Sequence, residues 1–349
     1  GSDRSADGRF VGVAPGANLV AVRAFDAQGA GRYIDVIKAI GWIIAHRDEF
    51  DIRVLNLSFS GDTVSEYWAD PLNQAVMRAW QHGIVVVAAA GNSGPELATI
   101  GVPGNVPYII TVGAMTDNYT PLDESDDALA SFSAAGPTLE GFVKPEVVAP
   151  GGHIWGLMPR NSWISEGYPQ FRHPDADYFN MSGTSQAAAI VSGVVALMLQ
   201  QDPSLQPDDV KCRLLTTARP AVLADGIPAY SILQQGAGLV DAAAATYATD
   251  RGCANLGINV GKDVAGTEHY RGPVQLDANG NYYIVDEAAR QVVEGDGLIW
   301  SRGTLWGRGN LWGRSLLWGR SQLASEIGTQ TSSSMLMRSM TINAWVDPE

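Results

Sequence analysis

Apolar and polar positions follow two alternating patterns between residue 18 and about residue 245. Short apolar runs rich in β-branched residues take turns with stretches of helical periodicity. This order is typical of parallel strands joined by crossover helices. We expect strands at residues 19–22, 54–57, 84–88, 108–112 and 146–149.

Helices are expected between these strands and after them. Residues 185–201 predict a buried helix, and another helix opens at Pro207. Residues 33–46 predict a helix with four positions on its inward face: Ile37, Ile40, Gly41 and Ile44. Together the elements predict an α/β fold with a doubly wound parallel sheet.

The helix after the second strand has clear start and stop signals. Asp70 can cap its first turn, Pro71 suits its first position, and Gly83 can end it. Its expected inward residues are Leu72, Val76 and Trp80.

The amino-acid composition changes after Asp250. Short segments rich in Gly and Asp, such as residues 277–285, predict a small β-rich C-terminal extension. We therefore expect four parts: a main domain over 1–250, the β-rich extension over 251–294, a hexapeptide repeat over 295–322 and a C-terminal tail over 323–349.

The repeat places a tryptophan every six residues and an arginine two positions after each one. A step of six turns a helix by roughly 600°, so the rings would not share a helical face, whereas an even step keeps them on one side of an extended chain. The repeat is either a β-rich element packed on the main domain or a surface that binds glycan, protein or another anionic partner. Its members are Trp300, Trp306, Trp312, Trp318, Arg302, Arg308, Arg314 and Arg320.

Charge and hydropathy exclude two classes of partner. The chain has 37 acidic and 23 basic residues, a net charge of −14, so its surface repels phosphate backbones and nucleic acid is not an expected partner. A membrane span needs about 18 consecutive apolar residues. The longest candidate, residues 187–199, is shorter and contains Ser192 and Gly193, so no span is expected.

The two cysteines, Cys212 and Cys253, are too few for a disulfide scaffold or a cysteine-rich zinc site. They form either one bridge or two buried thiols. A bridge would tie the end of the main domain to the extension and would indicate an oxidising compartment.

Four short motifs occur in a fixed order along the main domain. They are GVAPGA at residues 12–17, AAGNSGP at 89–95, KPEVVAPG at 144–151 and SGTSQAA at 182–188. In this order they resemble the subtilisin-like serine peptidases, or subtilases. The resemblance covers about residues 8–245, and it implies a serine endopeptidase that is secreted, periplasmic or at the cell surface and acts on protein or peptide substrates.

The residues themselves agree with that chemistry. Ser185 stands at the start of an apolar helix, where free backbone N–H groups and the helix dipole favour negative charge. Its hydroxyl can attack a peptide carbonyl while its own N–H and the Asn92 amide hold the oxyanion. The alternative is structural: Ser185 caps the helix and Asn92 takes a turn conformation.

By the same resemblance, an extended substrate pairs with two main-chain edges. One edge is formed by Ser58, Phe59 and Ser60; the other runs over residues 26–31, including Asp26 and Gly29, with Tyr33 closing a pocket for the fourth residue before the cut. The resemblance places the primary pocket at Ala89, Ala90, Gly91, Ser93 and Gly101. This pocket is uncharged, so we expect large uncharged side chains there; Asp26 either favours a basic residue or is a solvated loop acid.

The base and orienting acid of a catalytic triad have no matching motif in the sequence. The family supplies them from Asp-Thr-Gly and His-Gly-Thr-His segments N-terminal to the first motif, so we expect this chain alone to be inactive and the two groups to come from a segment outside it. Either the sequence begins within its gene or a separate chain carries them; the alternative is a pseudoprotease that serves as a binding module. The five histidines, expected at the surface, are His46, His82, His153, His173 and His269.

Two structural expectations complete the picture. The same N-terminal part would supply a strand between residues 19–22 and 54–57, so the chain alone is expected to be poorly stable. Calcium is common in the family, but here only the carbonyls of Gly104, Val106 and Ile109 offer a match, and that match is weak.

Overall fold

The structure is a computed structural model. It describes residues 8–223, 228–278 and 280–286, together with the backbone of three short strands at 291–294, 322–323 and 339–341. The tryptophans and arginines of the hexapeptide repeat lie outside the described residues, so the expectations for the repeat stay predictions.

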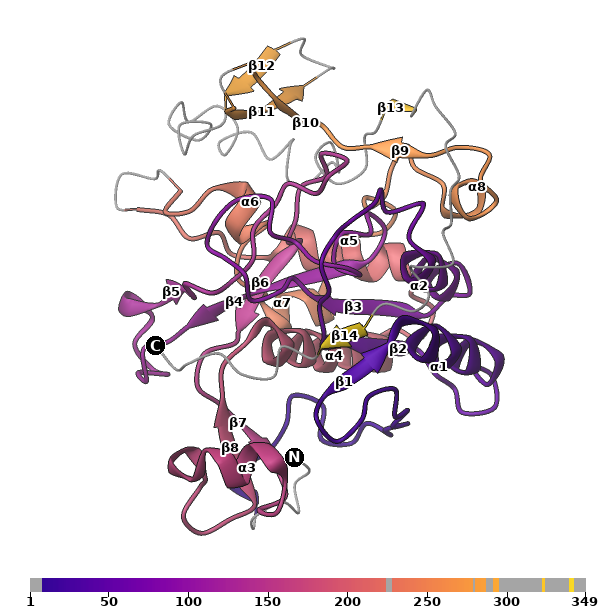
Figure 1. Ribbon diagram of the computed structural model, residues 1–349. Coiled ribbons are helices and arrows are strands. Elements are labelled where there is room, and N and C mark those ends of the chain that lie inside the picture. Colours follow the sequence, from indigo (N-terminus) through magenta and orange to yellow (C-terminus); the bar gives the residue numbers. More distant parts are fainter. Residues whose placement is uncertain are drawn as a thin grey trace.

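A five-stranded sheet forms the centre of the main domain (Figure 1). Four strands run parallel, with β3 between β2 and β4 and with β6 on β4, while the short β5 pairs antiparallel with β4. The register is fixed by pairs such as Leu55 with Val86. The strands are β2 (Val54–Leu57), β3 (Val85–Ala89), β4 (Ile110–Thr116), β5 (Ala128–Leu129) and β6 (Val147–Pro150).

Helices cover the sheet and bury its apolar side chains, as a doubly wound α/β domain requires. The long helix α4 packs against β2, β3, β4 and β6, and α1 packs against α2. Every residue of β3 and β4 is buried, which explains why the sequences of both strands are rich in apolar residues. The helices are α1 (Tyr33–Ala45), α2 (Pro71–Gln81), α3 (Trp163–Gly167), α4 (Thr184–Gln201), α5 (Pro207–Thr217), α6 (Ile232–Gln235), α7 (Ala242–Tyr247) and α8 (Val260–Val264), with 3₁₀ turns η2 (Glu124–Asp126) and η3 (Pro169–Phe171).

The predicted start of α2 is confirmed in detail. The Asp70 carboxylate accepts hydrogen bonds from the backbone N–H groups of Leu72 and Asn73, and Pro71 takes the first position. Gly83 follows the helix with φ +78°, a left-handed conformation that costs glycine no steric strain. The expected inward residues Leu72, Val76 and Trp80 are all buried.

Two predictions about the N-terminal part are wrong. Residues 19–22 do not form a strand, and Leu19 is 91% exposed. In the described part of the chain no strand lies beside this run, and a β-branched run without a hydrogen-bonding partner gains no ladder. The predicted inward face of α1 is wrong for Gly41, which is exposed, whereas Ile40 is buried and Ile37 and Ile44 are partly buried against the core. The helix also buries Tyr33, Val36 and Ile43.

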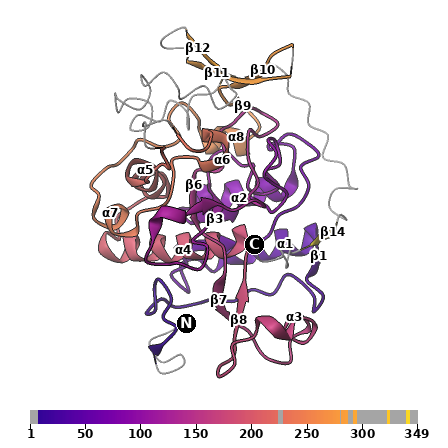
Figure 2. The same cartoon turned by 90° about the vertical axis from the view of Figure 1, so that its left-hand side faces the viewer.

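Smaller antiparallel pairs lie at opposite ends of the molecule (Figure 2). At one end β7 pairs with β8, and at the other β10, β11 and β12 form the β-rich extension. Two further pairs use residues near the C-terminus: β9 with β13 and β1 with β14. Their bounds are β1 (Ala30–Arg32), β7 (Ile154–Leu157), β8 (Tyr178–Met181), β9 (Tyr270–Arg271), β10 (Val274–Leu276), β11 (Tyr282–Asp286), β12 (Gln291–Glu294), β13 (Gln322–Leu323) and β14 (Ser339–Thr341).

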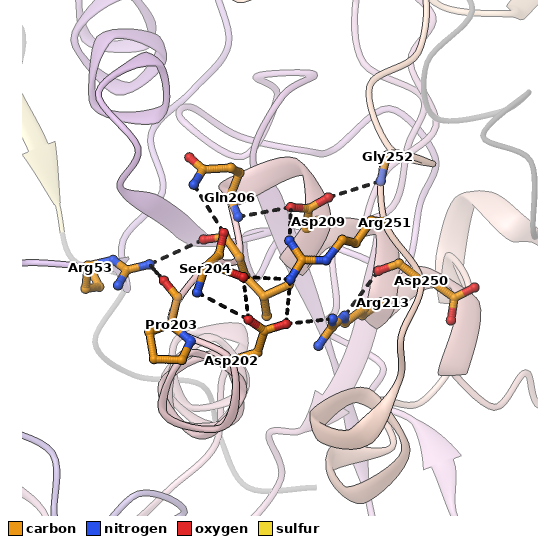
Figure 3. A network of polar contacts seen from close by, with 11 residues as sticks. Arg53, Asp202, Pro203, Ser204, Gln206, Asp209, Arg213, Asp250, Arg251 and Gly252 are labelled. Carbon is orange, nitrogen blue, oxygen red and sulfur yellow. Dashed lines mark hydrogen bonds and ion pairs between the residues drawn. The ribbon is translucent and has the colours of Figure 1, made fainter.

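The two cysteines form a disulfide between α5 and the segment that leaves the main domain. Beside it, an ionic network joins the same two parts (Figure 3). Asp202 at the end of α4 accepts hydrogen bonds from Arg251 at 2.6 Å and Arg213 at 3.1 Å, and Arg251 also reaches Asp209. The pKa of Asp202 is lowered to about 2. The hydrogen bond from the Ser204 side chain contributes most to this shift, and those from Arg251 and Arg213 contribute less.

Two lysines are fully buried and share one carboxylate. Lys144 Nζ lies 2.7 Å and Lys211 Nζ 2.8 Å from Glu146 Oε1. Lys211 also donates to the carbonyls of Pro107, Tyr108 and Ile109. Burial disfavours the charged form of Lys144 and lowers its pKa to about 7, although the nearby Glu146 carboxylate favours the charged form.

The extension is held to the main domain through a buried aspartate in α8. Asp263 accepts hydrogen bonds from the hydroxyls of Tyr67 and Tyr108, and its other oxygen lies 2.7 Å from His269 Nδ1. Next to this cluster the backbone N–H of Tyr67 donates to the buried carboxyl of Glu140 at 2.6 Å. Burial raises the pKa of Glu140 to about 7.

Within the described residues, none of the helices is both long and apolar enough to cross a membrane.

Candidate active site

Ser185 is the second residue of α4, directly after the turn that leads from β8 into the helix. Its side chain is partly exposed, and its hydroxyl donates to the carbonyl of Ser58 at 3.0 Å. The Ser58 hydroxyl in turn donates to the Ser185 carbonyl at 2.8 Å. This reciprocal pair fixes the start of α4 against the end of β2. The Ser185 N–H is one of the first N–H groups of the helix, and these have no hydrogen-bond partner within the helix.

Asn92 follows β3 and faces the same helix start. Its Oδ1 accepts hydrogen bonds from the backbone N–H of Thr184 at 3.0 Å and from the Thr184 hydroxyl at 2.8 Å. The Thr184 hydroxyl also accepts from the backbone N–H of Gly91 at 3.2 Å. With its oxygen held in this way, the amide presents Nδ2 as a donor.

Gly183 shows where the two donors converge. A Cβ atom on Gly183 would lie 3.4 Å from Asn92 Nδ2 and 3.7 Å from Ser185 N, so both nitrogens border the same small space. Gly183 has φ +156°, a conformation that side-chain-bearing residues rarely adopt, so this position favours glycine. Two N–H donors that border one space are an arrangement that can stabilise an oxyanion.

The residues expected to form the primary pocket gather after β2 and β3. Ala89 and Ala90 are buried at the end of β3, and the backbone N–H of Gly101 donates to the Ala90 carbonyl at 3.1 Å. The Ser60 hydroxyl lies between two of the glycines: 3.0 Å from the Cβ position of Gly91 and closer still to that of Gly101. Phe59 is buried, and Ser93 is exposed at the mouth of this region.

The second expected edge is the turn before β1 and the strand itself. Asp26 is exposed, and its Oδ1 accepts from the backbone N–H groups of Gln28 and Ala30 at 2.9 Å each. One oxygen of the carboxylate therefore holds its own loop. Gly29 in this turn has φ +76°. Tyr33 is only 1% exposed and belongs to the main core.

The sequence comparison agrees with this geometry. A model of the subtilase family, peptidase S8, matches residues 1–254. The chain belongs to the subtilase family.

Individual subtilases are similar over the main domain. Serine protease AprX of Bacillus subtilis (strain 168) is 43% identical over 215 residues, which are 60% of this chain and 48% of the relative. Subtilisin DY of Bacillus licheniformis is 34% identical over 210 residues, 60% of this chain and 63% of the relative. The chain thus spans about half to somewhat under two thirds of the length of these relatives.

Solved structures of similar fold are proteases as well. The patellamide maturation protease PatA is 27% identical, with a TM-score of 0.52 over 70% of this chain and 78% of that chain. A psychrophilic protease named S41 is 26% identical, with a TM-score of 0.51 over 65% of this chain and 69% of that chain.

Among the described residues, the Ser185 hydroxyl donates to the Ser58 carbonyl, and no hydrogen bond joins it to a histidine. His46 and His82 follow α1 and α2, and Nδ1 of each ring lies 2.8 Å from a carbonyl oxygen of its own helix. The expectation that all five are surface residues is wrong for His153 and His269, which are 8% and 4% exposed. His153 is stacked on Tyr119, and His269 is paired with Asp263, contacts that no local sequence signal announces.

Two of the three carbonyls expected to offer a calcium site already accept hydrogen bonds from side chains. The Ile109 carbonyl accepts hydrogen bonds from the ammonium groups of Lys144 and Lys211, and the Gly104 carbonyl accepts from Thr111. Two positive charges at one of the proposed ligands would repel a divalent cation. In the part of the chain that the structure describes, there is also no group of three or more His, Cys, Asp or Glu side chains that could hold a metal ion.

Sequence reasoning missed one contributor to the site. Thr184 had no assigned role, yet it holds the oxygen of Asn92 through both its N–H and its hydroxyl. The available signal was the position of Thr184 in the SGTS motif, directly before Ser185.

Proposed function

We propose that this chain carries the nucleophile half of a serine endopeptidase, and that Ser185 forms the acyl-enzyme. The observation that supports this most directly is the convergence of Asn92 Nδ2 and Ser185 N on one space at the start of α4. The histidine base and its orienting aspartate come from a segment outside this chain. Without them, a serine hydroxyl is a weak nucleophile, and the chain alone is inactive.

In the proposed reaction, Ser185 Oγ attacks the carbonyl carbon of the peptide bond and its proton passes to the imidazole. The negative charge that forms on the carbonyl oxygen is held by the Asn92 amide and the Ser185 N–H. The C–N bond then breaks, and the leaving amine takes the proton from the imidazole. Water, activated by the same base, releases the acyl group and restores the serine.

The substrate in this proposal is an extended peptide that pairs with two main-chain edges, at Ser58–Ser60 and at the turn and strand around Gly29. No charged side chain belongs to the proposed primary pocket, which favours an uncharged residue before the cut. The exposed oxygen of Asp26 favours a basic residue further along the cleft. The disulfide supports a secreted, periplasmic or cell-surface location.

The experiment uses the complete protein, with the segment that supplies the aspartate and histidine. A fluorophosphonate should label it at Ser185, and Ser185→Ala should abolish both labelling and peptide hydrolysis. A matched control is Ser192→Ala, because Ser192 lies two turns further along α4 and its hydroxyl bonds Asn56 and Ala188. Proteolysis that persists in Ser185→Ala would overturn the proposal.

The second candidate function is that of a catalytically inactive binding protein whose Trp/Arg repeat binds glycan or protein. The regular six-residue spacing of aromatic and cationic residues favours it. Failure of the complete protein to react with fluorophosphonate, together with glycan binding that is lost when the four tryptophans are replaced by alanine, would favour this reading over the peptidase.

A further inference from the structure

Strand β14, near the C-terminus, pairs with strand β1 in the cleft region. The pairing is antiparallel and joins Ala30 with Thr341, Gly31 with Met340 and Arg32 with Ser339. Figures 1 and 2 both draw β14, in yellow, directly beside β1. About three hundred residues separate the two strands in the sequence. Among the described strands, β1 and β14 pair only with each other.

The register identifies the pair of residues that exchanges hydrogen bonds. The main chain of Ala30 is already engaged on its other side, because its N–H donates to Asp26 Oδ1 and its carbonyl accepts from Asp26 N. Successive residues of an antiparallel strand point their main-chain groups to opposite sides. Gly31 is therefore the residue of β1 that faces β14, and Met340 is its partner.

Strand β1 is close to the candidate nucleophile through a short series of contacts. The Cβ position of Gly31 lies 2.8 Å from the ring of Phe25, and that ring packs on Phe59 with centroids 5.3 Å apart. Phe59 directly follows Ser58, whose carbonyl accepts from the Ser185 hydroxyl. These contacts place β1 near the edge formed by Ser58, Phe59 and Ser60, which is the other edge of the proposed substrate site.

We propose that the segment around Met340 is an internal peptide ligand of the substrate edge: it adds a strand to β1 at Gly31 and competes with substrate for that position. The assignment of β1 as a substrate edge rests on the proposed function; the strand pairing itself does not. Strand addition uses main-chain groups, so it requires little of the ligand's side chains. A ligand on the same chain binds intramolecularly, so it competes with substrate at an effective concentration that the length and stiffness of the joining chain set.

The test of the pairing compares two proline variants of the full chain. Met340→Pro removes the N–H that faces Gly31, whereas Thr341→Pro removes an N–H that points away from β1. Hydrogen exchange of the Gly31 amide should rise at least tenfold in Met340→Pro and stay within about twofold of the original chain in Thr341→Pro. Equal exchange in the original chain and in Met340→Pro would overturn the inference.

The test of the ligand role uses a synthetic peptide with the sequence of residues 335–346. It should bind the Met340→Pro chain at least tenfold more tightly than the original chain, in which β1 is occupied. N-methylation of the peptide at the Met340 position should abolish binding, whereas N-methylation at the Thr341 position should not. Equal binding to both chains would overturn the proposal.

These readouts need no catalysis, so they remain decisive if the proposed peptidase activity fails. Where the complete protein does hydrolyse peptides, Met340→Pro should lower the KM for an extended peptide severalfold and leave kcat unchanged. Loss of the β1–β14 pairing with no change in KM would show that β1 is not the substrate edge, and would overturn the competition part of the inference.

Discussion

Asn92 and Thr184 are joined by two hydrogen bonds that fix the direction of the Asn92 amide. Its oxygen accepts from the backbone N–H and from the hydroxyl of Thr184, at 3.0 and 2.8 Å. Because Thr184 is the first residue of α4 and Ser185 is the second, the helix start positions the proposed nucleophile and the proposed oxyanion donor Asn92 together. The donor is thus prepared before substrate arrives, which is what makes such a group effective.

Replacing Asn92 by aspartate should remove the donor and keep the acceptor for Thr184. In the complete protein we expect kcat to fall by roughly 10²- to 10³-fold, a magnitude established on a member of this family rather than derived from this structure. Asn92→Ala should lose a similar factor. Kinetics with a peptide substrate measure both variants.

Thr184 supplies the matched control for this prediction. Thr184→Ser keeps the hydroxyl and should stay near the original activity. Thr184→Val removes the hydroxyl bond to the Asn92 oxygen but keeps the bond from the backbone N–H, so it should lose activity by a smaller factor than Asn92→Ala. An Asn92→Ala variant with unchanged kcat would show that the amide is not an oxyanion donor.

The buried carboxylate of Glu146 balances two buried ammonium groups. Glu146→Gln leaves Lys144 and Lys211 without a counter-charge in the core, and we expect the free energy of unfolding to fall by about 3–5 kcal/mol. Urea denaturation followed by tryptophan fluorescence measures it. The exposed pair of Lys262 and Glu268 is the control, since Glu268→Gln should cost no more than about 1 kcal/mol. Equal effects of the two substitutions would contradict this account.

The disulfide between Cys212 and Cys253 closes a loop over 41 residues of sequence separation. Restricting the unfolded chain over such a loop contributes about 4 kcal/mol in the chain-entropy view. A reducing agent should therefore shift the urea midpoint of the original chain to lower concentration. The same reagent should leave the double variant Cys212→Ala, Cys253→Ala unchanged, and a shift in that variant would point to another target of the reagent.

Titration of the buried Glu140 carboxyl makes the free energy of unfolding depend on pH. Burial raises its pKa from 4.5 to about 7, so between these values the folded chain holds a proton that the unfolded chain has released. The stability due to this group is complete below about pH 4.5 and is lost as the pH rises through about 7. We expect the loss to amount to about 1–3 kcal/mol.

Glu140→Gln tests this directly, because glutamine keeps the acceptor for the Tyr67 N–H and does not titrate. Urea unfolding at pH 4.5 and pH 7.5 should show a smaller pH dependence in the variant than in the original chain. An identical pH dependence would exclude Glu140 as the titrating group. Other buried acids, such as Asp263, contribute equally to both proteins and cancel in the comparison.

Much of the architecture follows from local sequence. Strand β2 occupies the predicted residues, β3, β4 and β6 lie within one or two residues of their predicted starts, and α2 begins at the predicted cap. These signals are local because a cap, a proline at the first turn and a continuous apolar run act through neighbouring residues. The order of the four motifs likewise pointed to the subtilase family, which the family match shows.

Other features depended on parts of the chain that are distant in sequence. Residues 19–22 have the composition of a strand but no partner among the described residues, and His269 is buried because Asp263 and Trp68 surround it. Whether the cysteines were bridged also needed the fold, which brings their Cα atoms to 5.2 Å. The pairing of Gly31 with Met340 left no trace in the sequence, because main-chain hydrogen bonds do not depend on side-chain identity. Local chemistry therefore determined the elements and the candidate nucleophile, while tertiary packing decided which of them have partners.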